Sequence, residues 1–152
     1  MVDRTNRKGI ILTIELPRHS SPDCRFESLW LECTTRIARG TSRDVYEIPG
    51  HLDKVLKVSN NQSNFSNWME ILVYNQFNEG DDLAEIFSWS WSGKFLVMER
   101  LTRLSPGDLN SYNFPSYLTD RKPENYGKDA SGKIKALDYA ALAIAAPRND
   151  FL

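Results

Sequence analysis

The twenty-residue stretch 120–139 constrains the fold of this 152-residue chain more than any other feature. Residues 128–132 have the composition of a turn, and residues 133–137 follow as a short strand, so the stretch predicts a β-hairpin. A hairpin brings its two ends together, which places the amide of Asn125 beside the carboxylate of Asp138. Both side chains offer the hard oxygen ligands that Mg²⁺ prefers. The alternative is an ordinary surface hairpin with polar ends.

The same stretch contains Asp-Arg-Lys-Pro-Glu-Asn, and its asparagine precedes an Asp-Tyr-Ala sequence by thirteen residues. These motifs resemble the catalytic loop D-x-K-P-E-N and the metal-binding D-F-G of eukaryotic-like protein kinases. The resemblance implies that Asp120 orients the acceptor hydroxyl and that Lys122 steadies the transferring phosphate. It also implies that Asn125 and Asp138 hold Mg²⁺.

The chain upstream of these motifs carries a counterpart of the glycine-rich loop of kinases at residues 37–46. Only the middle glycine, Gly40, is kept. Thr41 and Ser42 could donate to nucleotide phosphates through hydroxyl and backbone groups, as a glycine loop does with its backbone. Arg43 replaces a flanking glycine and could either reach a phosphate or block it. Taken alone, the segment is a polar turn between two strands.

Residues 55–58 look like the strand that carries the kinase lysine, here Lys57. Considered alone, a charge within an apolar run indicates a solvated strand residue. Apolar residues at helical spacing predict a helix over 66–77. The resemblance makes Glu70, in the first turns of this helix, the partner that orients Lys57 toward the phosphates of ATP. Glu79, at the helix end, is the alternative partner.

Residues 83–91 alternate in polarity and residues 95–99 return as a buried strand. This pair looks like the two strands that lead to the kinase hinge. Met98 then occupies the gatekeeper position and Glu99 the first hinge position. The backbone from Glu99 to Leu101 is expected to face the edge of the adenine ring.

The fold class that follows is α+β: a kinase-like small lobe, made of an antiparallel sheet and one main helix, followed by the catalytic hairpin. Residues 10–16 and 26–37 are predicted to be strands, separated by a turn or loop at 17–22. The segment 102–115 holds at most one short helix. We expect one domain over residues 1–152.

The spacing of the motifs departs from that of complete kinases. Glu99 reaches Asp120 in twenty-one residues, about half the usual interval of the family. The His-Arg pair that normally precedes the catalytic aspartate is absent. The chain ends fourteen residues after Asp138, so the resemblance is to a strongly truncated kinase without most of its helical large lobe. The apolar surface beside the hairpin then needs a cover, for which residues 140–146 are a candidate.

Composition argues against several classes of function. The net charge of −1 gives no electrostatic case for nucleic acid or an anionic membrane. No apolar run is long enough to span a membrane or to act as a signal peptide. Cys24 and Cys33, without any Cys/His zinc spacing, fit a reduced cytoplasmic protein with free thiols.

The resemblance supports two functions from different classes. The first is a minimal protein kinase that binds ATP and Mg²⁺ and transfers phosphate to a protein hydroxyl. The second is a catalytically inactive kinase-like module that docks on a host protein and inhibits it, in the manner of a phage or bacterial effector. The expected partner is accordingly a protein substrate or a host target, and a second copy of the chain is another candidate.

Overall fold

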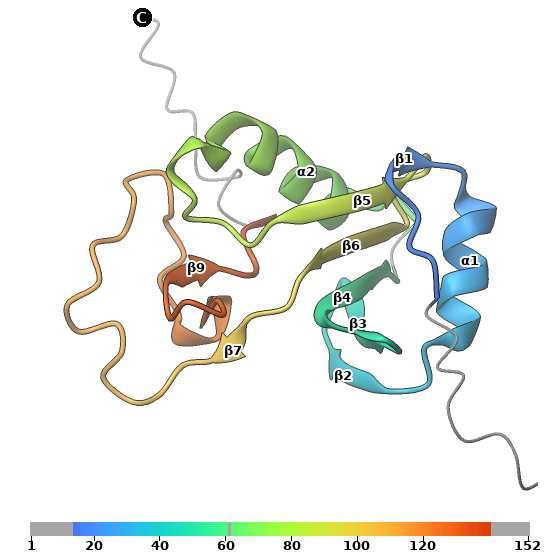
Figure 1. The fold of residues 1–152 in the computed structure, drawn as a ribbon. Helices are drawn as coiled ribbons and strands as arrows, with labels where there is room; N and C mark the ends of the chain where they lie inside the picture. The colour runs from blue at the N-terminus through green and yellow to red at the C-terminus, as the bar shows by residue number, and fades with distance from the viewer. Residues whose placement is uncertain (1–13, 61, 141–152) are drawn as a thin grey trace, which may run out of the picture.

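The computed structural model describes residues 14–60 and 62–140, which form a six-stranded sheet, a small three-stranded sheet and two α-helices (Figure 1). The large sheet has the strand order β1-β5-β6-β4-β3-β2, and only the β1–β5 pair is parallel. Its strands are β1 (His19–Ser21), β2 (Arg36–Arg39), β3 (Arg43–Ile48), β4 (His51–Ser59), β5 (Ile86–Ser90) and β6 (Phe95–Glu99).

The central strands form because the chain alternates between β-branched or aromatic strands and tight turns. β3 and β4 are joined at Pro49-Gly50, where Gly50 adopts a φ of +79° that a residue with a Cβ rarely reaches. β4 lies between β3 and β6 and is buried from Val55 to Ser59. The predicted strands over 83–91 and 95–99 are confirmed as β5 and β6.

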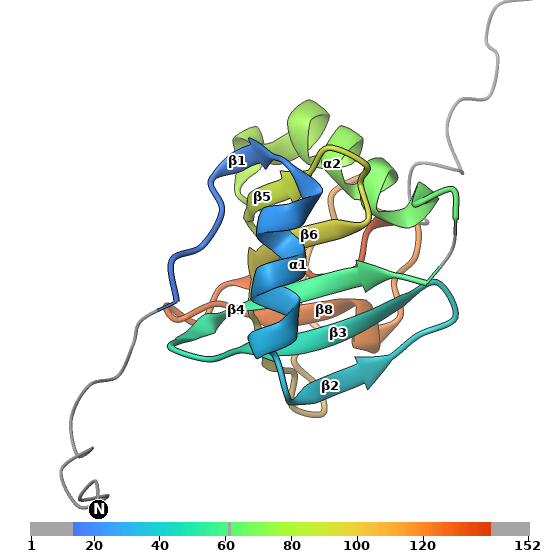
Figure 2. The same cartoon turned by 90° about the vertical axis from the view of Figure 1, so that its right-hand side faces the viewer.

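The two helices cover opposite faces of the sheet. α2 (Phe65–Phe77) packs Ile71 and Val73 into one core cluster with the sheet residues Val55 and Met98. α1 (Asp23–Glu32) lies across β6, β4 and β3 on the other face (Figure 2). Its buried side chains join a second cluster made of Leu16, Phe26, Leu29, Cys33, Ile48, Leu56, Val58, Phe95 and Val97.

The prediction for the N-terminal part of the chain was wrong in two respects. Residues 26–37 do not form one strand, because 23–32 is α1 and only 36–39 is β2. The spacing of Phe26, Leu29 and Cys33 is that of one helical face, and Pro22 directly precedes the helix. The expected turn over 17–22 contains β1 instead.

The first predicted strand falls partly on residues that the structure does not describe. Residues 10–13 are among these, and residues 14–16 do not belong to a strand. Leu16 nevertheless packs in the core beneath α1.

The second half of the chain forms the predicted hairpin. β8 (Tyr126–Lys128) and β9 (Ile134–Ala136) are antiparallel, and β7 (Thr102–Arg103) pairs with β8 on its other side. Two short 3₁₀ turns are present: η1 (Asn78–Gly80) follows α2, and η2 (Pro123–Asn125) precedes β8. The hairpin that the sequence predicts is therefore confirmed.

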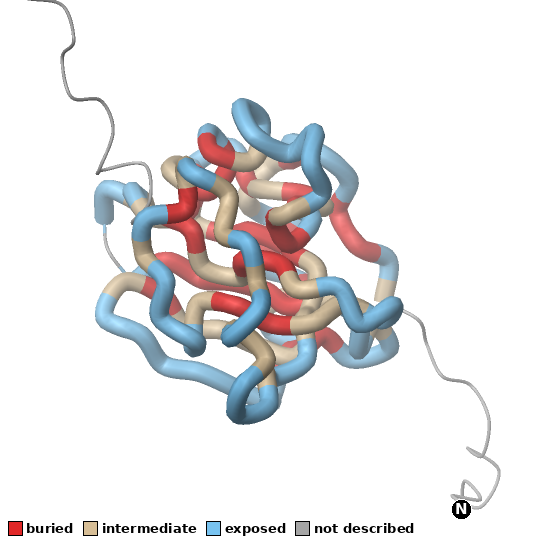
Figure 3. Tube along the Cα trace, turned by 90° about the vertical axis from the view of Figure 1, so that its left-hand side faces the viewer, coloured by how far each residue is buried: buried red, intermediate tan, exposed pale blue. Residues whose placement is uncertain are grey.

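The segment 104–118 covers the hairpin with a series of turns, and the short helix allowed at 105–106 does not form. Phe114 and Tyr112 pack their rings edge-on against the buried Tyr126 at 5.2 and 6.0 Å. Figure 3 shows buried chain at the centre of this side of the molecule, surrounded by exposed turns. Of the predicted cover over residues 140–146, Ala140 is buried, and residues 141–146 lie outside the described residues.

Within residues 14–60 and 62–140, no helix has the length and apolar character needed to cross a membrane.

We predict that α1 contributes strongly to stability because Phe26 is fully buried and its ring stacks on Phe95 with 6.0 Å between centroids. Phe26→Ala should lower the free energy of unfolding by about 3–5 kcal/mol, as expected for a large buried aromatic side chain. Urea unfolding measures this, with the exposed Glu27→Ala as the matched control on the same helix. Equal stability of both variants would show that α1 does not pack on the sheet.

Candidate nucleotide site

The centre of the candidate site is the carboxylate of Glu70, which lies on α2 and is fully buried. Lys57 Nζ on β4 lies 3.1 Å from both carboxylate oxygens. Arg43 on β3 donates to the same two oxygens over 2.6 and 2.8 Å. The backbone N–H of Tyr139 completes the set at 3.3 Å. Glu70 therefore joins two strands, a helix and the segment that follows β9.

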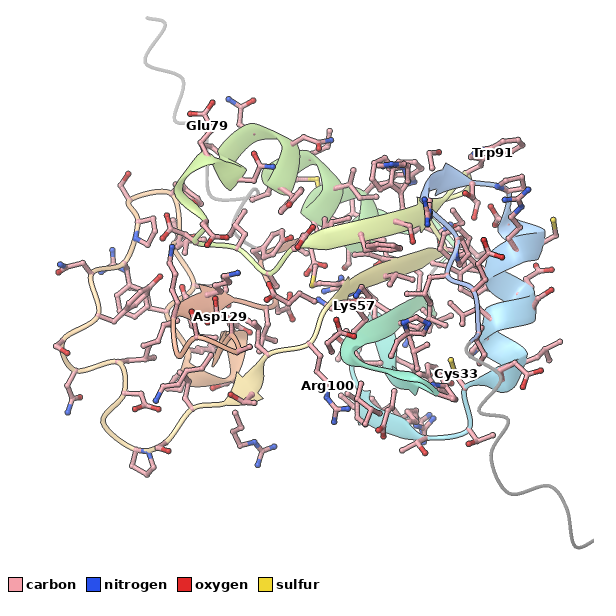
Figure 4. All side chains as sticks on the ribbon, viewed as in Figure 1. Cys33, Lys57, Glu79, Trp91, Arg100 and Asp129 are labelled. Carbon is pink, nitrogen blue, oxygen red and sulfur yellow. The ribbon has the colours of Figure 1, made fainter. Side chains whose placement is uncertain are left out.

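The predicted pair of Lys57 with Glu70 is present, and the alternative partner Glu79 lies elsewhere. Figure 4 shows Glu79 at the outer edge of the molecule, beyond the end of α2, whereas Lys57 lies near the middle. The role of the pair toward a nucleotide stays a prediction.

Strand register brings Arg43 to this cluster. Val45 lies opposite Lys57 in the β3–β4 pair, and Arg43 shares the face of Val45 because side chains repeat every two residues along a strand. The turn before β3 is tight: Gly40 N–H donates to the carbonyl of Arg43 over 2.8 Å. A Cβ on Gly40 would lie 2.9 Å from that oxygen, so the turn requires glycine here.

The electrostatics of the cluster keep Glu70 ionised. Burial by itself would raise the pKa of Glu70, but the charges of Arg43 and Lys57 outweigh it and lower the pKa from 4.5 to about 2. Burial lowers the pKa of Lys57, an effect that Glu70 opposes. The carboxylate of Glu70 can be buried in ionised form because neighbouring cations compensate its charge.

The hairpin places Asp138 at the edge of this cluster. The carbonyl of Asn125 accepts the N–H groups of Leu137 at 2.8 Å and of Asp138 at 3.4 Å, so the two predicted metal ligands are neighbours in space. Asp138 Oδ1 lies 3.1 Å from Arg43 Nη2, and its side chain is 47% exposed. Lys57 Nζ also donates to the carbonyl of Leu137 over 2.7 Å.

An open cleft of about 970 Å³ lies beside the cluster, between the large sheet and the hairpin. Lys57 contributes to its wall, and so do the predicted hinge residues Met98, Glu99 and Leu101. The side chains that border the cleft are mostly apolar; besides these four residues they are Ile37, Ala38, Val45, Leu52, Val55, Arg100, Thr102, Arg103, Leu104, Pro123, Glu124, Tyr126 and Leu137.

The structure does not bring the remaining predicted loop residues to this cleft. Gly40, Thr41 and Ser42 are not among its lining residues in the described part of the chain. Ser42 instead accepts a hydrogen bond from Ser66 Oγ, near the start of α2, over 3.0 Å. Residues 40–42 thus form the turn between β2 and β3, whereas Ile37, Ala38 and Val45 from the same glycine-loop segment line the cleft.

Asp120 and Lys122 belong to the loop that precedes β8. Asp120 is half-buried, and its carbonyl accepts a hydrogen bond from the Tyr126 hydroxyl over 3.0 Å. Its Oδ1 accepts the backbone N–H of Lys122 at 3.4 Å, and Lys122 is exposed. These contacts hold Asp120 within its own loop, and its catalytic role stays a prediction.

The donors for Mg²⁺ have the right chemistry, but Asp138 already has a cationic partner. The guanidinium of Arg43 lies 3.1 Å from Oδ1, one of the two carboxylate oxygens of Asp138. In the described part of the chain, no group of three or more His, Cys, Asp or Glu side chains is arranged to hold a metal ion. A divalent ion at Asp138 would therefore lie next to the Arg43 guanidinium, whose positive charge opposes its binding.

The sequence did not predict the pairing of Arg43, although it identified Arg43 as a departure from the glycine loop. The available signal was its position two residues before Val45 on an apolar strand face. Asn67 was missed as well; its side-chain oxygen accepts from Arg43 over 3.3 Å, and its amide donates to the carbonyls of Gly93 and Lys94. Asn67 thereby fixes Arg43 to the turn before β6.

Comparison with solved structures shows the fold. The chain superposes on the apo GRMZM2G135359 pseudokinase with a TM-score of 0.53 and 10% sequence identity, covering 90% of this chain and 63% of that one. A structure of WbdD with the kinase inhibitor LY294002 matches with a TM-score of 0.44 and 16% identity, over 67% of this chain and 31% of WbdD. The chain thus spans less than two thirds of either protein.

The fold is that of a kinase-like small lobe followed by a hairpin. The structural similarity to the pseudokinase therefore confirms the predicted fold class. No protein-family model matches the sequence, and no curated protein matches it.

We predict that Glu70→Gln destabilises the fold, because it removes the fully buried negative charge that pairs with both Lys57 and Arg43. The loss should be about 3–5 kcal/mol, as for other buried ion pairs from which one partner is removed. Urea unfolding at neutral pH measures it. Glu79→Gln is the matched control, since Glu79 is exposed, and should change stability little.

The same variant gives a test by pH. The folded pKa of Glu70, about 2, lies below its ordinary value of 4.5. The stability that Glu70 provides is therefore fully present above pH 4.5 and is lost as the pH falls toward 2. The difference in unfolding free energy between wild type and Glu70→Gln should shrink over this interval. A difference that is constant with pH would contradict the assignment.

Proposed function

We propose that this chain is a nucleotide-binding protein with a kinase-like fold, and that ATP binds in the cleft between the large sheet and the hairpin. The observation that carries the proposal is the buried Lys57–Glu70 pair at 3.1 Å, with Lys57 in the wall of a cleft that the expected hinge residues also line. In kinases this pair orients the lysine toward the α- and β-phosphates.

The adenine ring would lie toward the hinge. Val45, Val55 and Leu137 give this part of the cleft an apolar lining, which suits a flat heterocycle. The backbone from Glu99 to Leu101 borders the same space and supplies polar groups that could meet the edge of the ring.

The phosphates would lie toward Lys57. Its ammonium group is held by Glu70 and by the carbonyl of Leu137, so its direction is fixed before a ligand arrives. A fixed charge costs less ordering on binding than a free surface lysine would.

Two uses of bound ATP are consistent with the proposal. Phosphate transfer to a protein hydroxyl is supported by the resemblance of Asp120 and Lys122 to the catalytic loop, and it would call for Mg²⁺ at Asn125 and Asp138. The contact of Arg43 with Asp138 favours the second use, a binding module without turnover that acts on a protein partner. A second copy of the chain is a further candidate partner.

We predict that Lys57→Met weakens ATP binding by about tenfold or more, because one charge near the phosphates is lost. Methionine has a similar volume, and Glu70 keeps Arg43 as a partner, so the fold should survive. Isothermal titration calorimetry with ATP gives the affinity. Lys54→Met is the control: Lys54 lies on the same strand, where it pairs with Asp53, and is not part of this cleft. Unchanged affinity of Lys57→Met would refute the placement of the phosphates.

A second experiment separates the two uses of ATP. If the chain is a kinase, Asp120→Asn should abolish transfer of radiolabelled γ-phosphate to a protein acceptor, while ATP affinity changes little because Asp120 does not line the cleft. If the chain is a binding module, wild type and Asp120→Asn should both lack transfer and should capture the same protein partner.

A further inference from the structure

Four charged side chains, of which Lys57 lines the cleft, form one connected group beside it. Arg43 contacts both carboxylates, Glu70 at 2.6 Å and Asp138 at 3.1 Å, and Lys57 contacts Glu70 at 3.1 Å. Two positive and two negative charges leave the group neutral. Without Arg43 the same group would carry a net charge of −1 beside the expected position of the phosphates.

We propose that Arg43 is the permanent counter-cation of Asp138 and takes the place of a divalent metal, so that nucleotide binding in this cleft is independent of metal. The inference rests on the proposed function, because it concerns how the same cleft accepts phosphates. The inference goes beyond the proposed function because it assigns a role to Arg43, a residue for which the resemblance to kinases implies no role.

The geometry indicates that Arg43 does not leave readily. Its guanidinium makes a bidentate contact with Glu70, the arrangement in which an arginine binds a carboxylate best. Asn67 accepts a third hydrogen bond from it, and the side chain is only 7% exposed. A metal ion that claimed Asp138 would have to place its charge next to this fixed cation, which repels it.

The exposure of Asp138 explains why metal would otherwise be needed. Its side chain is 47% exposed, so its charge is felt by a ligand in solution beside it. ATP carries negative charges of its own, and a carboxylate without a counter-charge would repel them. Arg43 removes that repulsion from within the protein. A metal ion would be needed to remove this repulsion only if Asp138 had no cationic neighbour.

The test is a comparison of ATP affinity with excess Mg²⁺ and with EDTA, by calorimetry on the purified chain. For wild type we expect the two dissociation constants to agree within about twofold, well below the tenfold that 1.4 kcal/mol represents. Binding that appears only with Mg²⁺ would overturn the inference and leave the proposed function intact.

Variants make the role of Arg43 specific. Arg43→Gln should bind ATP about tenfold more weakly in EDTA than in Mg²⁺, because Asp138 is then without a counter-charge. Arg43→Lys keeps the charge but not the bidentate contact, and it should bind ATP in EDTA more tightly than Arg43→Gln does. Arg36→Gln, on the exposed face of β2, is the matched control. Metal dependence that is the same in Arg43→Gln and wild type would overturn the inference.

A measurement without nucleotide separates this inference from the proposed function. We expect the nucleotide-free wild type to leave added Mn²⁺ free, as seen in the electron paramagnetic resonance signal, and Arg43→Gln to bind it. Wild type that binds Mn²⁺, with Asp138→Asn abolishing it, would overturn the role of Arg43. If no ATP binds under any condition, the proposed function fails, and the Mn²⁺ result still decides whether Arg43 excludes metal from Asp138.

Discussion

The carboxylate of Glu70 is the interaction on which the rest of the site depends. It accepts hydrogen bonds from Arg43, Lys57 and the backbone of Tyr139, which belong to β3, β4 and the segment after β9. β3 and β4 are neighbouring paired strands, whereas Tyr139 is distant from both in sequence and reaches them at this buried group. An unpaired carboxylate in an apolar core is very costly, so these partners are what allow Glu70 to be buried with its charge.

Apolar packing surrounds the charged cluster of Glu70, Arg43 and Lys57 and holds its elements in place. The large sheet is covered by α2 on the side of the cleft and by α1 on the other, so each face of its central strands is buried in one of two clusters. Met98 and Val55 face the cleft side, while Leu56 and Val97 face α1. The sheet therefore offers a rigid support on which small shifts of the charged side chains are resisted.

The backbone fold agrees with the kinase resemblance, whereas the charged side chains of the site differ from it at Arg43. The hinge strands, Lys57 and the hairpin follow the arrangement that the resemblance implies. Arg43, at the position of a glycine, adds a cation where that arrangement leaves room for phosphates and metal. Arg43 thus adds a positive charge beside Asp138 within an unchanged fold, and charges inside a protein act over short distances with little screening.

The sequence by itself determined the elements whose signal is local. Turn residues and apolar periodicity, which act between near neighbours, predict three elements. These are the hairpin around 128–132, the helix over 66–77 and the paired strands over 83–91 and 95–99. α1 was missed because the apolar residues of 26–37 were assigned to a strand, although Phe26, Leu29 and Cys33 have helical spacing. The pairing of Arg43 with Asp138, 95 residues apart, was decided by tertiary structure alone. Only strand register and the burial of Glu70 bring those two charges together, and neither is encoded within one segment of the chain.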